Sequence, residues 1–291
     1  MLLYTLIAGI LFGLFYALMG LGLNLVFGVM KIVNLAHGDF LMLGAYGVYI
    51  AYTLHGVNPL IAIVFEVLVF LVAGFILYYG LVPRLLQSED PEMLSLILFF
   101  GVSQIIESLA VFAFGINPVT VDLSAFGNAP LILFGQQFQT AWWVSVLVSL
   151  VVLALLYLFL YRSRIGIATR ALMGNREEAA ASGIDTHRVS ALAFGIGLAT
   201  AGVAGALLPF MLGGIYPTMG VDLTATSFAI IVIGSLGNPL GTILGGLVYG
   251  ISVMLMQTYL SSWAQMAPFV LLLLILLIRP SGLLGKGARH A

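Results

Sequence analysis

The chain has 291 residues and a net charge of −1, and its 10 basic and 11 acidic side chains make up only 7% of the sequence, against 62% apolar residues. A soluble domain typically carries about 25% charged residues, whereas stretches such as 2–30 and 223–278 contain none. A membrane-spanning helix needs about 20 apolar residues, so the composition predicts an all-α polytopic membrane protein. It excludes a soluble enzyme, a nucleic-acid-binding protein and a disordered chain. A porin-type barrel is also excluded, because its strands would alternate polar and apolar residues.

The first apolar segment, residues 2–30, has no positively charged region in front of it and runs on too far for a signal peptide. We therefore expect it to be retained as the first helix. The polar residues 31–39 then interrupt the helical pattern. The sequence contains no Cys, which excludes disulfides and thiolate metal sites.

Polar breaks divide the rest of the chain into apolar segments, which predict a bundle of about eight or nine transmembrane helices. They are expected at 2–30, 40–54, 60–83, 93–116, 141–161, 189–213, 223–237, 242–260 and 266–278. The third is expected to stop at Pro83-Arg84, before a solvated loop. The number of crossings depends on whether the two short segments, 40–54 and 223–237, cross fully or re-enter.

Basic residues are concentrated in two places. Five lie in the segment 162–188 and three in the C-terminal tail: Arg162, Arg164, Arg170, Arg176, Arg188, Arg279, Lys286 and Arg289. Because Lys and Arg are enriched in cytoplasmic loops, we expect both regions, and Arg84, on the cytoplasmic side. The 117–140 loop has no Lys or Arg and is expected on the opposite side, with the link at 214–222. The side of the N-terminus stays open.

Small residues recur at four-residue spacing in the predicted helices, which allows helix backbones to approach closely. They are Gly9 and Gly13; Gly237, Gly241 and Gly245; and Gly246 and Gly250. Two interruptions, Asn34–Gly38 and Gly237–Gly241, fall one in each half of the chain. They indicate discontinuous helices with a cavity or protein around them, because freed backbone groups must be satisfied inside a membrane.

Catalytic signatures are absent: the sequence has no HExxH, GxGD or GxSxG motif and no phosphate-binding loop. His37 and Asp39 are spaced as metal ligands could be, but a hydrogen-bonded, helix-breaking turn is the favoured interpretation. Glu66 and Glu107 lie in apolar segments, where a charge is costly. They are either a proton or ion relay or structural acids, and both interpretations remain open.

The segment 162–188 is too charged to be buried. Within it, ALMGNREEAAASG predicts a short amphipathic helix that ends at Gly183. An ordered helix between two spans on the cytoplasmic side is typical of a docking element. A solvated loop helix without a partner is the alternative.

Three blocks of sequence resemble the branched-chain amino acid permease family, the membrane subunits of bacterial ABC importers that work with a binding protein. They are GLNLVFGVMKIVNLAHGDFLMLGAY (22–46), the stretch 162–207, and SFAIIVIGSLGNPLGTILGGLVYGI (227–251), which RPSGLLG (279–285) follows. The resemblance implies one permease domain over 1–291 in the bacterial inner membrane, multi-pass and with a cytoplasmic C-terminus. It implies a cytoplasmic coupling loop at 162–188 and a periplasmic loop at 117–140.

The resemblance also implies residue roles. In the family, a coupling helix fits a groove on the ATPase subunit, and the matching residues here are Arg176, Glu177, Glu178, Ala179, Ala180 and Gly183. The helix breaks along the translocation path correspond to Asn34, Ala36, His37, Gly38, Gly234, Gly237, Asn238, Pro239, Gly241 and Gly245.

The implied partners are a homologous permease chain, two ATP-binding subunits and a periplasmic solute-binding protein. ATP then belongs to the partner subunits, and no cofactor is expected in this chain. The implied activity is translocation of Leu, Ile and Val. A urea or short-chain amide importer permease is the alternative within the class, and a stand-alone secondary transporter or channel is the alternative from another class. An intramembrane enzyme has no supporting constellation.

Overall fold

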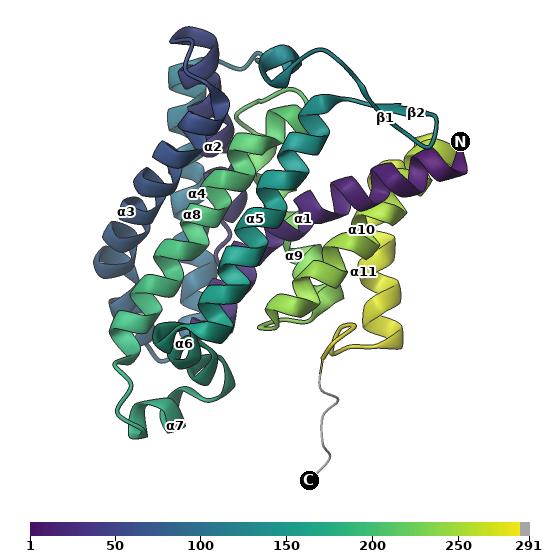
Figure 1. The fold of residues 1–291 in the computed structure, drawn as a ribbon. Coiled ribbons are helices and arrows are strands. Elements are labelled where there is room, and N and C mark those ends of the chain that lie inside the picture. Colours follow the sequence, from purple (N-terminus) through teal and green to yellow (C-terminus); the bar gives the residue numbers. More distant parts are fainter. Residues whose placement is uncertain (286–291) are drawn as a thin grey trace.

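In the computed structural model, which describes residues 1–285, the chain is a bundle of helices with one small β-hairpin (Figure 1). Six helices are long and apolar enough to cross a membrane. They are α1 (Leu2–Met30), α3 (Pro59–Leu86), α4 (Pro91–Phe114), α5 (Thr140–Arg162), α8 (Thr186–Leu212) and α10 (Pro239–Tyr259). The predicted all-α polytopic membrane fold is thereby confirmed.

The other elements are shorter. The helices are α2 (His37–Val48), which a π-helical turn at Tyr49–Leu54 prolongs, α6 (Arg164–Gly174), α7 (Arg176–Ala181), α9 (Met219–Gly234) and α11 (Ala267–Ile278). Short 3-10 helices lie at Leu123–Phe126 and Ser261–Met266. Strands β1 (Leu131–Leu133) and β2 (Gln136–Phe138) pair antiparallel, with Leu131 opposite Phe138.

The bundle has two distinct ends. At the hairpin end, the Tyr4 ring stacks on Phe138 at 4.9 Å between centroids, and Val119 pairs with Ile215. The start of α1, the 117–140 loop and the segment after α8 therefore lie together. At the α6–α7 end, Lys31 shares one cleft with the α3–α4 turn and with Arg176. Figure 1 shows α6 and α7 at one end and the hairpin at the other.

Three helices begin with an Asn or Asp followed by Pro: Asn58-Pro59 before α3, Asp90-Pro91 before α4 and Asn238-Pro239 before α10. The side-chain oxygen accepts a hydrogen bond from a free N–H of the first turn, and Pro has no N–H to satisfy there. These dipeptides fix where the helices start. Inside α3, Pro83 does not end the helix as expected, and α3 continues to Leu86. Pro83 lies in the last turn of α3, so the helix continues past it and lacks only the one backbone hydrogen bond that an N–H at this position would donate.

The chain enters α2 and α9 in the same way, through a non-helical segment that turns back into the bundle. After α1 reaches the α6–α7 end, the chain turns back through the non-helical residues 31–36. α2 then begins inside the bundle, where His37 lies 2.9 Å from the carbonyl of Met19. α2 then runs toward the hairpin end, where Tyr46 stacks on Phe114 at the end of α4. Correspondingly, α8 ends at the hairpin end, residues 213–218 turn back, and α9 starts against α2.

Each short predicted segment is therefore the helical half of a broken crossing, and the non-helical chain before it, 31–36 or 213–218, is the other half. The two crossings have opposite directions, as in transporters with inverted repeats. The predicted break at Gly237–Gly241 is not the counterpart of Asn34–Gly38, because it is a tight turn between α9 and α10. The counterpart is the segment 213–218, whose sequence (GGIYPT) is typical of an ordinary loop.

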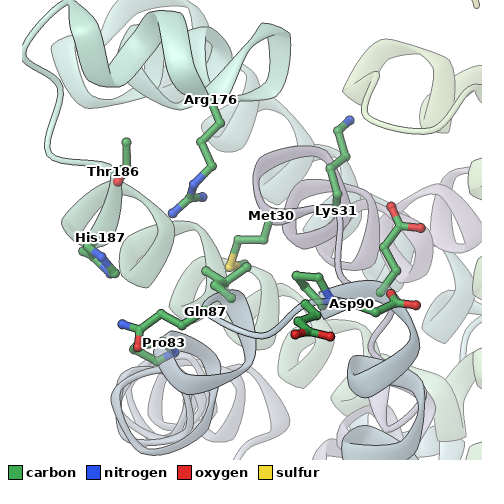
Figure 2. Close-up of a pocket in the computed structure, with 12 residues that line it drawn as sticks. Met30, Lys31, Pro83, Gln87, Asp90, Arg176, Thr186 and His187 are labelled. Carbon is green, nitrogen blue, oxygen red and sulfur yellow. The ribbon is translucent and has the colours of Figure 1, made fainter.

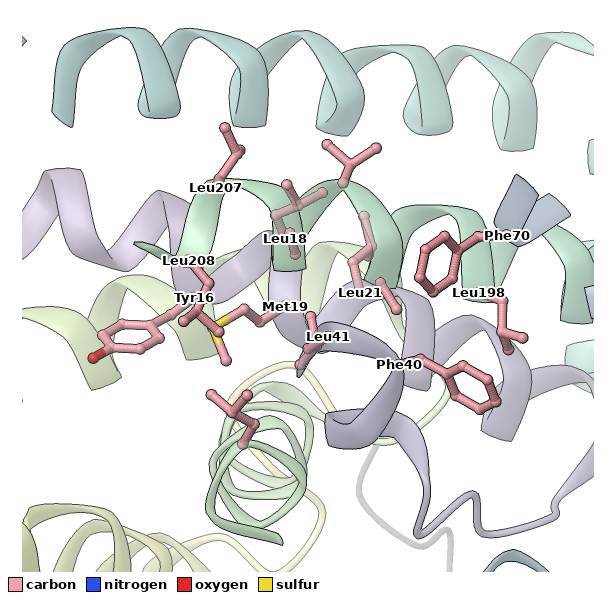
Figure 3. Packing of buried hydrophobic residues seen from close by; sticks show 14 of the residues in the cluster. Tyr16, Leu18, Met19, Leu21, Phe40, Leu41, Phe70, Leu198, Leu207 and Leu208 are labelled. Atoms are coloured by element: carbon pink, nitrogen blue, oxygen red, sulfur yellow. The ribbon is translucent and has the colours of Figure 1, made fainter. Parts of the chain in front are cut away.

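Helices α1 and α8 form the centre of the bundle, with 78% and 89% of their most apolar windows buried, against 39% or less for the other long helices. Figure 3 shows Leu18, Met19 and Leu21 of α1 packed among Phe40, Leu41 and the α8 leucines. As predicted, glycines bring helices together. A β-carbon at Gly246 or Gly250 would overlap the backbone of α1 at Ala17 or Gly13.

The expected single helix over ALMGNREEAAASG is wrong: α6 and α7 are separate helices, and Asn175 separates them. The Asn175 side chain accepts hydrogen bonds from the N–H groups of Glu177 and Glu178, and so it caps a new helix instead of continuing the first. Lys286 and Arg289, part of the argument for a cytoplasmic C-terminus, lie outside the described residues.

Candidate functional site

The first predicted break is a compact, buried turn. Asn34 is fully buried, and its Oδ1 accepts a hydrogen bond from the N–H of Ala36 at 3.1 Å. The ring Nε2 of His37 lies 2.9 Å from the carbonyl oxygen of Met19 in α1. The side chains of the turn thus replace hydrogen bonds that the interrupted helix lacks.

The start of α2 is joined to the start of α9 through Gly38. Its N–H donates to Oγ1 of Thr224 at 2.8 Å, and the Thr224 hydroxyl donates to the carbonyl of Leu35 at 3.0 Å. A β-carbon at Gly38 would overlap the carbonyl oxygen of Gly220. Only Gly at both positions lets the first turns of the two half-helices touch.

The second predicted break is held by a residue that sequence reasoning missed. Asn24, fully buried in α1, donates from its amide to the carbonyls of Ser235 (3.2 Å) and Asn238 (3.0 Å) and to the hydroxyl of Thr242. Its Oδ1 accepts from the N–H of Gly237. A polar side chain inside an otherwise apolar 29-residue helix was the available signal, because such groups need partners within a membrane.

The C-terminal sequence RPSGLLG folds back onto this turn as a short strap, residues 279–285. The N–H groups of Leu283 and Leu284 donate to the carbonyls of Ile233 (2.9 Å) and Gly234 (3.1 Å), which end α9. Asn238 donates from its amide to the Leu284 carbonyl at 3.3 Å. The strap thereby satisfies helix-terminal carbonyls that would otherwise be unpaired.

The predicted coupling residues lie together on α7 and just after it. Glu177, Glu178, Ala180 and Gly183 are exposed, whereas Ala179 is buried. The chain passes Gly183 with a φ of +83°, which favours glycine, and nothing lies within 4 Å of a β-carbon built there. The segment thus presents a short, capped, solvent-facing helix at the α6–α7 end.

Two clefts lie at this end of the bundle. One, of about 380 Å³, lies between Arg170 and Met173 of α6 and the α9–α10 turn at Gly237–Pro239. The structure therefore brings the second predicted break next to the coupling region, and away from Asn34 and His37.

The other cleft, of about 600 Å³, lies beside α7 and is lined by charges of both signs (Figure 2). Arg176 reaches into it from the start of α7, and its guanidinium donates to Oγ of Ser190 at 3.2 Å. Lys31 and the acidic residues Glu89 and Asp90 line the same cleft. Within residues 1–285, none of these charged groups forms an ion pair across it.

Of the two acids noted in apolar segments, Glu66 of α3 is 8% exposed and packs against the backbone of Gly47, with no hydrogen-bond partner among the described residues. Glu107 of α4 is half-buried. A proton or ion relay and a purely structural role both remain predictions for these two acids.

Comparison with known proteins matches residues 5–278 to the family described as branched-chain amino acid transport system / permease component. The chain belongs to this permease family. It is 30% identical to the high-affinity branched-chain amino acid transport system permease protein LivH of Escherichia coli (strain K12), over 96% of this chain and 94% of that protein. No solved structure matches significantly.

Two further relatives extend the comparison. BraD of Pseudomonas aeruginosa, another high-affinity branched-chain amino acid permease protein, is 29% identical over 98% of this chain and 96% of its own length. LivM of Escherichia coli (strain K12), a permease protein of the same kind of system, is 26% identical over 92% of this chain but only 67% of its own length. This permease thus resembles two differently named permease chains.

Proposed function

We propose that this chain is one of two membrane subunits of a bacterial ABC importer that translocates the branched-chain amino acids Leu, Ile and Val. The main support is the family match across residues 5–278, which agrees with the resemblance of three separate sequence blocks. The second membrane subunit would be a homologous permease, because the chain is similar to both LivH-type and LivM-type proteins. Two ATP-binding subunits and a periplasmic solute-binding protein complete the complex.

In this proposal the α6–α7 end faces the cytoplasm and the hairpin end faces the periplasm of the inner membrane. Positively charged residues are enriched on the cytoplasmic side of a membrane protein. The five arginines of the segment 162–188 all lie on or beside α6 and α7: Arg162, Arg164, Arg170, Arg176 and Arg188. The 117–140 loop, which has no Lys or Arg, lies at the other end with the start of α1. The loaded binding protein docks there.

Coupling to ATP hydrolysis would pass through α7. Its exposed residues Glu177, Glu178 and Ala180 fit a groove on the ATPase, while buried Ala179 anchors the helix to the bundle. A push on α7 reaches α6, and it passes from Met173 of α6 to Gly237 in the α9–α10 turn through Gly28 of α1, which lies against both. From there, α9 carries the displacement to its contact with α2 in the middle of the bundle.

The proposed function is tested by ATP hydrolysis of the complete complex in lipid vesicles, with leucine present or absent. We expect leucine to stimulate hydrolysis only when the binding protein is present. Stimulation by urea or amides alone would replace the substrate class. If no stable complex with an ATPase forms, the importer proposal fails and a stand-alone transporter takes its place.

The coupling role is tested separately with Gly183→Val. Because Gly183 has a φ of +83° and an open β-carbon position, the substitution strains the end of α7 without a clash elsewhere. We expect uptake to fall while ATP hydrolysis continues. Gly80→Val, at an equally open position inside α3, is the matched control. Unchanged uptake by Gly183→Val would refute the assignment.

A further inference from the structure

One carboxylate in the middle of the bundle has no partner. Asp39, in the first turn of α2, is 1% exposed, and neither of its oxygens has a hydrogen-bond partner among the described residues. Its Oδ1 lies against the first turn of α9, where a β-carbon at Gly220 would overlap it. Ser103 and Glu107 of α4 lie on another side of the same carboxylate, without a hydrogen bond of standard length.

A second polar group nearby in the chain is also free. The side-chain amide Nδ2 of Asn34 is fully buried and has no acceptor among residues 1–285, although Oδ1 of the same side chain is used by Ala36. Buried polar groups are normally paired. An unused acceptor and an unused donor thus lie five residues apart, on either side of the turn that starts α2.

No Lys or Arg side chain of the described residues is placed to balance the charge of Asp39. The basic side chains of the described residues all lie in loops, in short helices α6 and α7, or in the terminal turns of long helices: Lys31, Arg84, Arg162, Arg164, Arg170, Arg176, Arg188 and Arg279. His37 turns its ring to the Met19 carbonyl. A buried carboxylate needs a charged partner or neutralisation, and no basic side chain within residues 1–285 supplies that partner.

The surroundings favour a zwitterion over a simple cation. The N-terminal ends of α2 and α9 meet here, and each carries a partial positive charge that attracts a carboxylate. Asp39 thus offers an unused acceptor for an ammonium group, while the partial charge of the two helix ends and the unused amide N–H of Asn34 favour a carboxylate.

We propose that Asp39 binds the α-ammonium group of the amino acid as it crosses the membrane, at the point where α2 and α9 meet. The inference rests on the proposed importer function and gives it an intramembrane substrate site. In this structure the first turns of α2 and α9 touch. The site opens when α9 moves away from α2. The alternative is a purely structural role, in which Asp39 only stabilises the start of α9.

The test uses the complete importer in vesicles and the substitution Asp39→Asn, which keeps the shape of the side chain and removes its charge. We expect leucine uptake to fall about tenfold or more, the effect of losing one charge-assisted hydrogen bond. Hydrolysis stimulated by the loaded binding protein stays within about twofold of the parent. Glu92→Gln, at an exposed acid in the first turn of α4, is the matched control and leaves both unchanged.

A second measurement separates substrate binding from a structural role. The complex without binding protein is heated in detergent with leucine, with 3-methylbutylamine, which keeps the ammonium group, or with 4-methyl-2-oxopentanoate, which lacks it. Ligands that bind the folded protein raise its melting temperature. We expect leucine and the amine, but not the oxo acid, to do so in the parent, and neither to do so in Asp39→Asn.

Several results would overturn the inference. They are normal uptake by Asp39→Asn, an equal fall of uptake and hydrolysis, equal stabilisation by the oxo acid, or no stabilisation of the parent by leucine. If hydrolysis by the parent responds to leucine while any of these occurs, the importer function stands and only the intramembrane site fails. If the parent does not respond to leucine at all, the proposed function itself has failed.

Discussion

Replacing Asn24 with Ala is expected to loosen the α9–α10 turn, because this one side chain ties α1 to four groups of the segment 235–242. The carbonyls of Ser235 and Asn238 would each keep one backbone donor, the N–H groups of Asn238 and Thr242. The N–H of Gly237 would keep none among the described residues. The main cost is therefore one unpaired N–H group together with the lost hydrogen bonds.

A buried, unpaired N–H costs about 1–3 kcal/mol. Since Gly237 is only partly buried, water replaces part of the lost bond, and we expect a total destabilisation of about 2 kcal/mol. For a chain of this size, each kcal/mol lowers the melting temperature by roughly 2–4 °C. The substitution should therefore lower the melting temperature by roughly 4–8 °C.

The assay is heating of the purified complex in detergent, followed by size-exclusion chromatography of the protein that stays folded. Asn128→Ala, in the exposed loop before the hairpin, is the control for loss of an Asn side chain. If Asn24→Ala melts within 1 or 2 °C of that control (about the error of such an assay), the four hydrogen bonds do not carry the stability that we assign to them.

Gly38→Ala is expected to reduce the yield of folded complex sharply, because overpacking at a backbone contact costs about 1–3 kcal/mol or more; Gly101→Ala, at an open helical position, should not reduce it. Asn34→Leu is expected to lower leucine uptake while the complex still assembles, as measured by transport and size exclusion. Gly282→Ala should lower the melting temperature more than Gly115→Ala does, because both glycines have positive φ but only Gly282 also packs against the α9 backbone.

Each of these predictions has a contradicting result. Equal yields for the two alanine variants at Gly38 and Gly101 would mean that α2 and α9 do not touch as described. Normal uptake by Asn34→Leu would make its turn a purely structural feature. Equal melting temperatures for the Gly282 and Gly115 variants would remove the strap at 279–285 from the stability of α9.

The long helices could be predicted from the sequence because each contains a long apolar segment with few or no charged residues, bounded by polar residues, Pro or Gly. The glycine contacts between α1 and α10 were equally visible, since small residues at four-residue spacing have few other uses in a membrane. Local hydrogen bonding was harder to predict. Asn175 starts a new helix only because its side chain captures two N–H groups ahead of it, and the surrounding composition favours one continuous helix.

The re-entrant segment at 213–218 could not be recognised from the sequence. Its residues are those of a surface loop. What distinguishes it is that the helix it leads into, α9, contacts the Gly38 turn, 186 residues before Thr224. The role of Asn24 has the same origin, because its four partners lie more than 200 residues further along the chain. Pairings at that distance leave no local pattern.

The central position of α1 has a consequence for biogenesis. This helix leaves the ribosome before the other described helices, yet its main partner, α10, follows more than 200 residues later. At a translation rate of about 5–20 residues per second, α1 waits roughly 10–40 s in the bilayer with Asn24 unpaired. It therefore needs to be stable in lipid on its own, or to be retained beside the insertion machinery, until the last third of the chain arrives to enclose it.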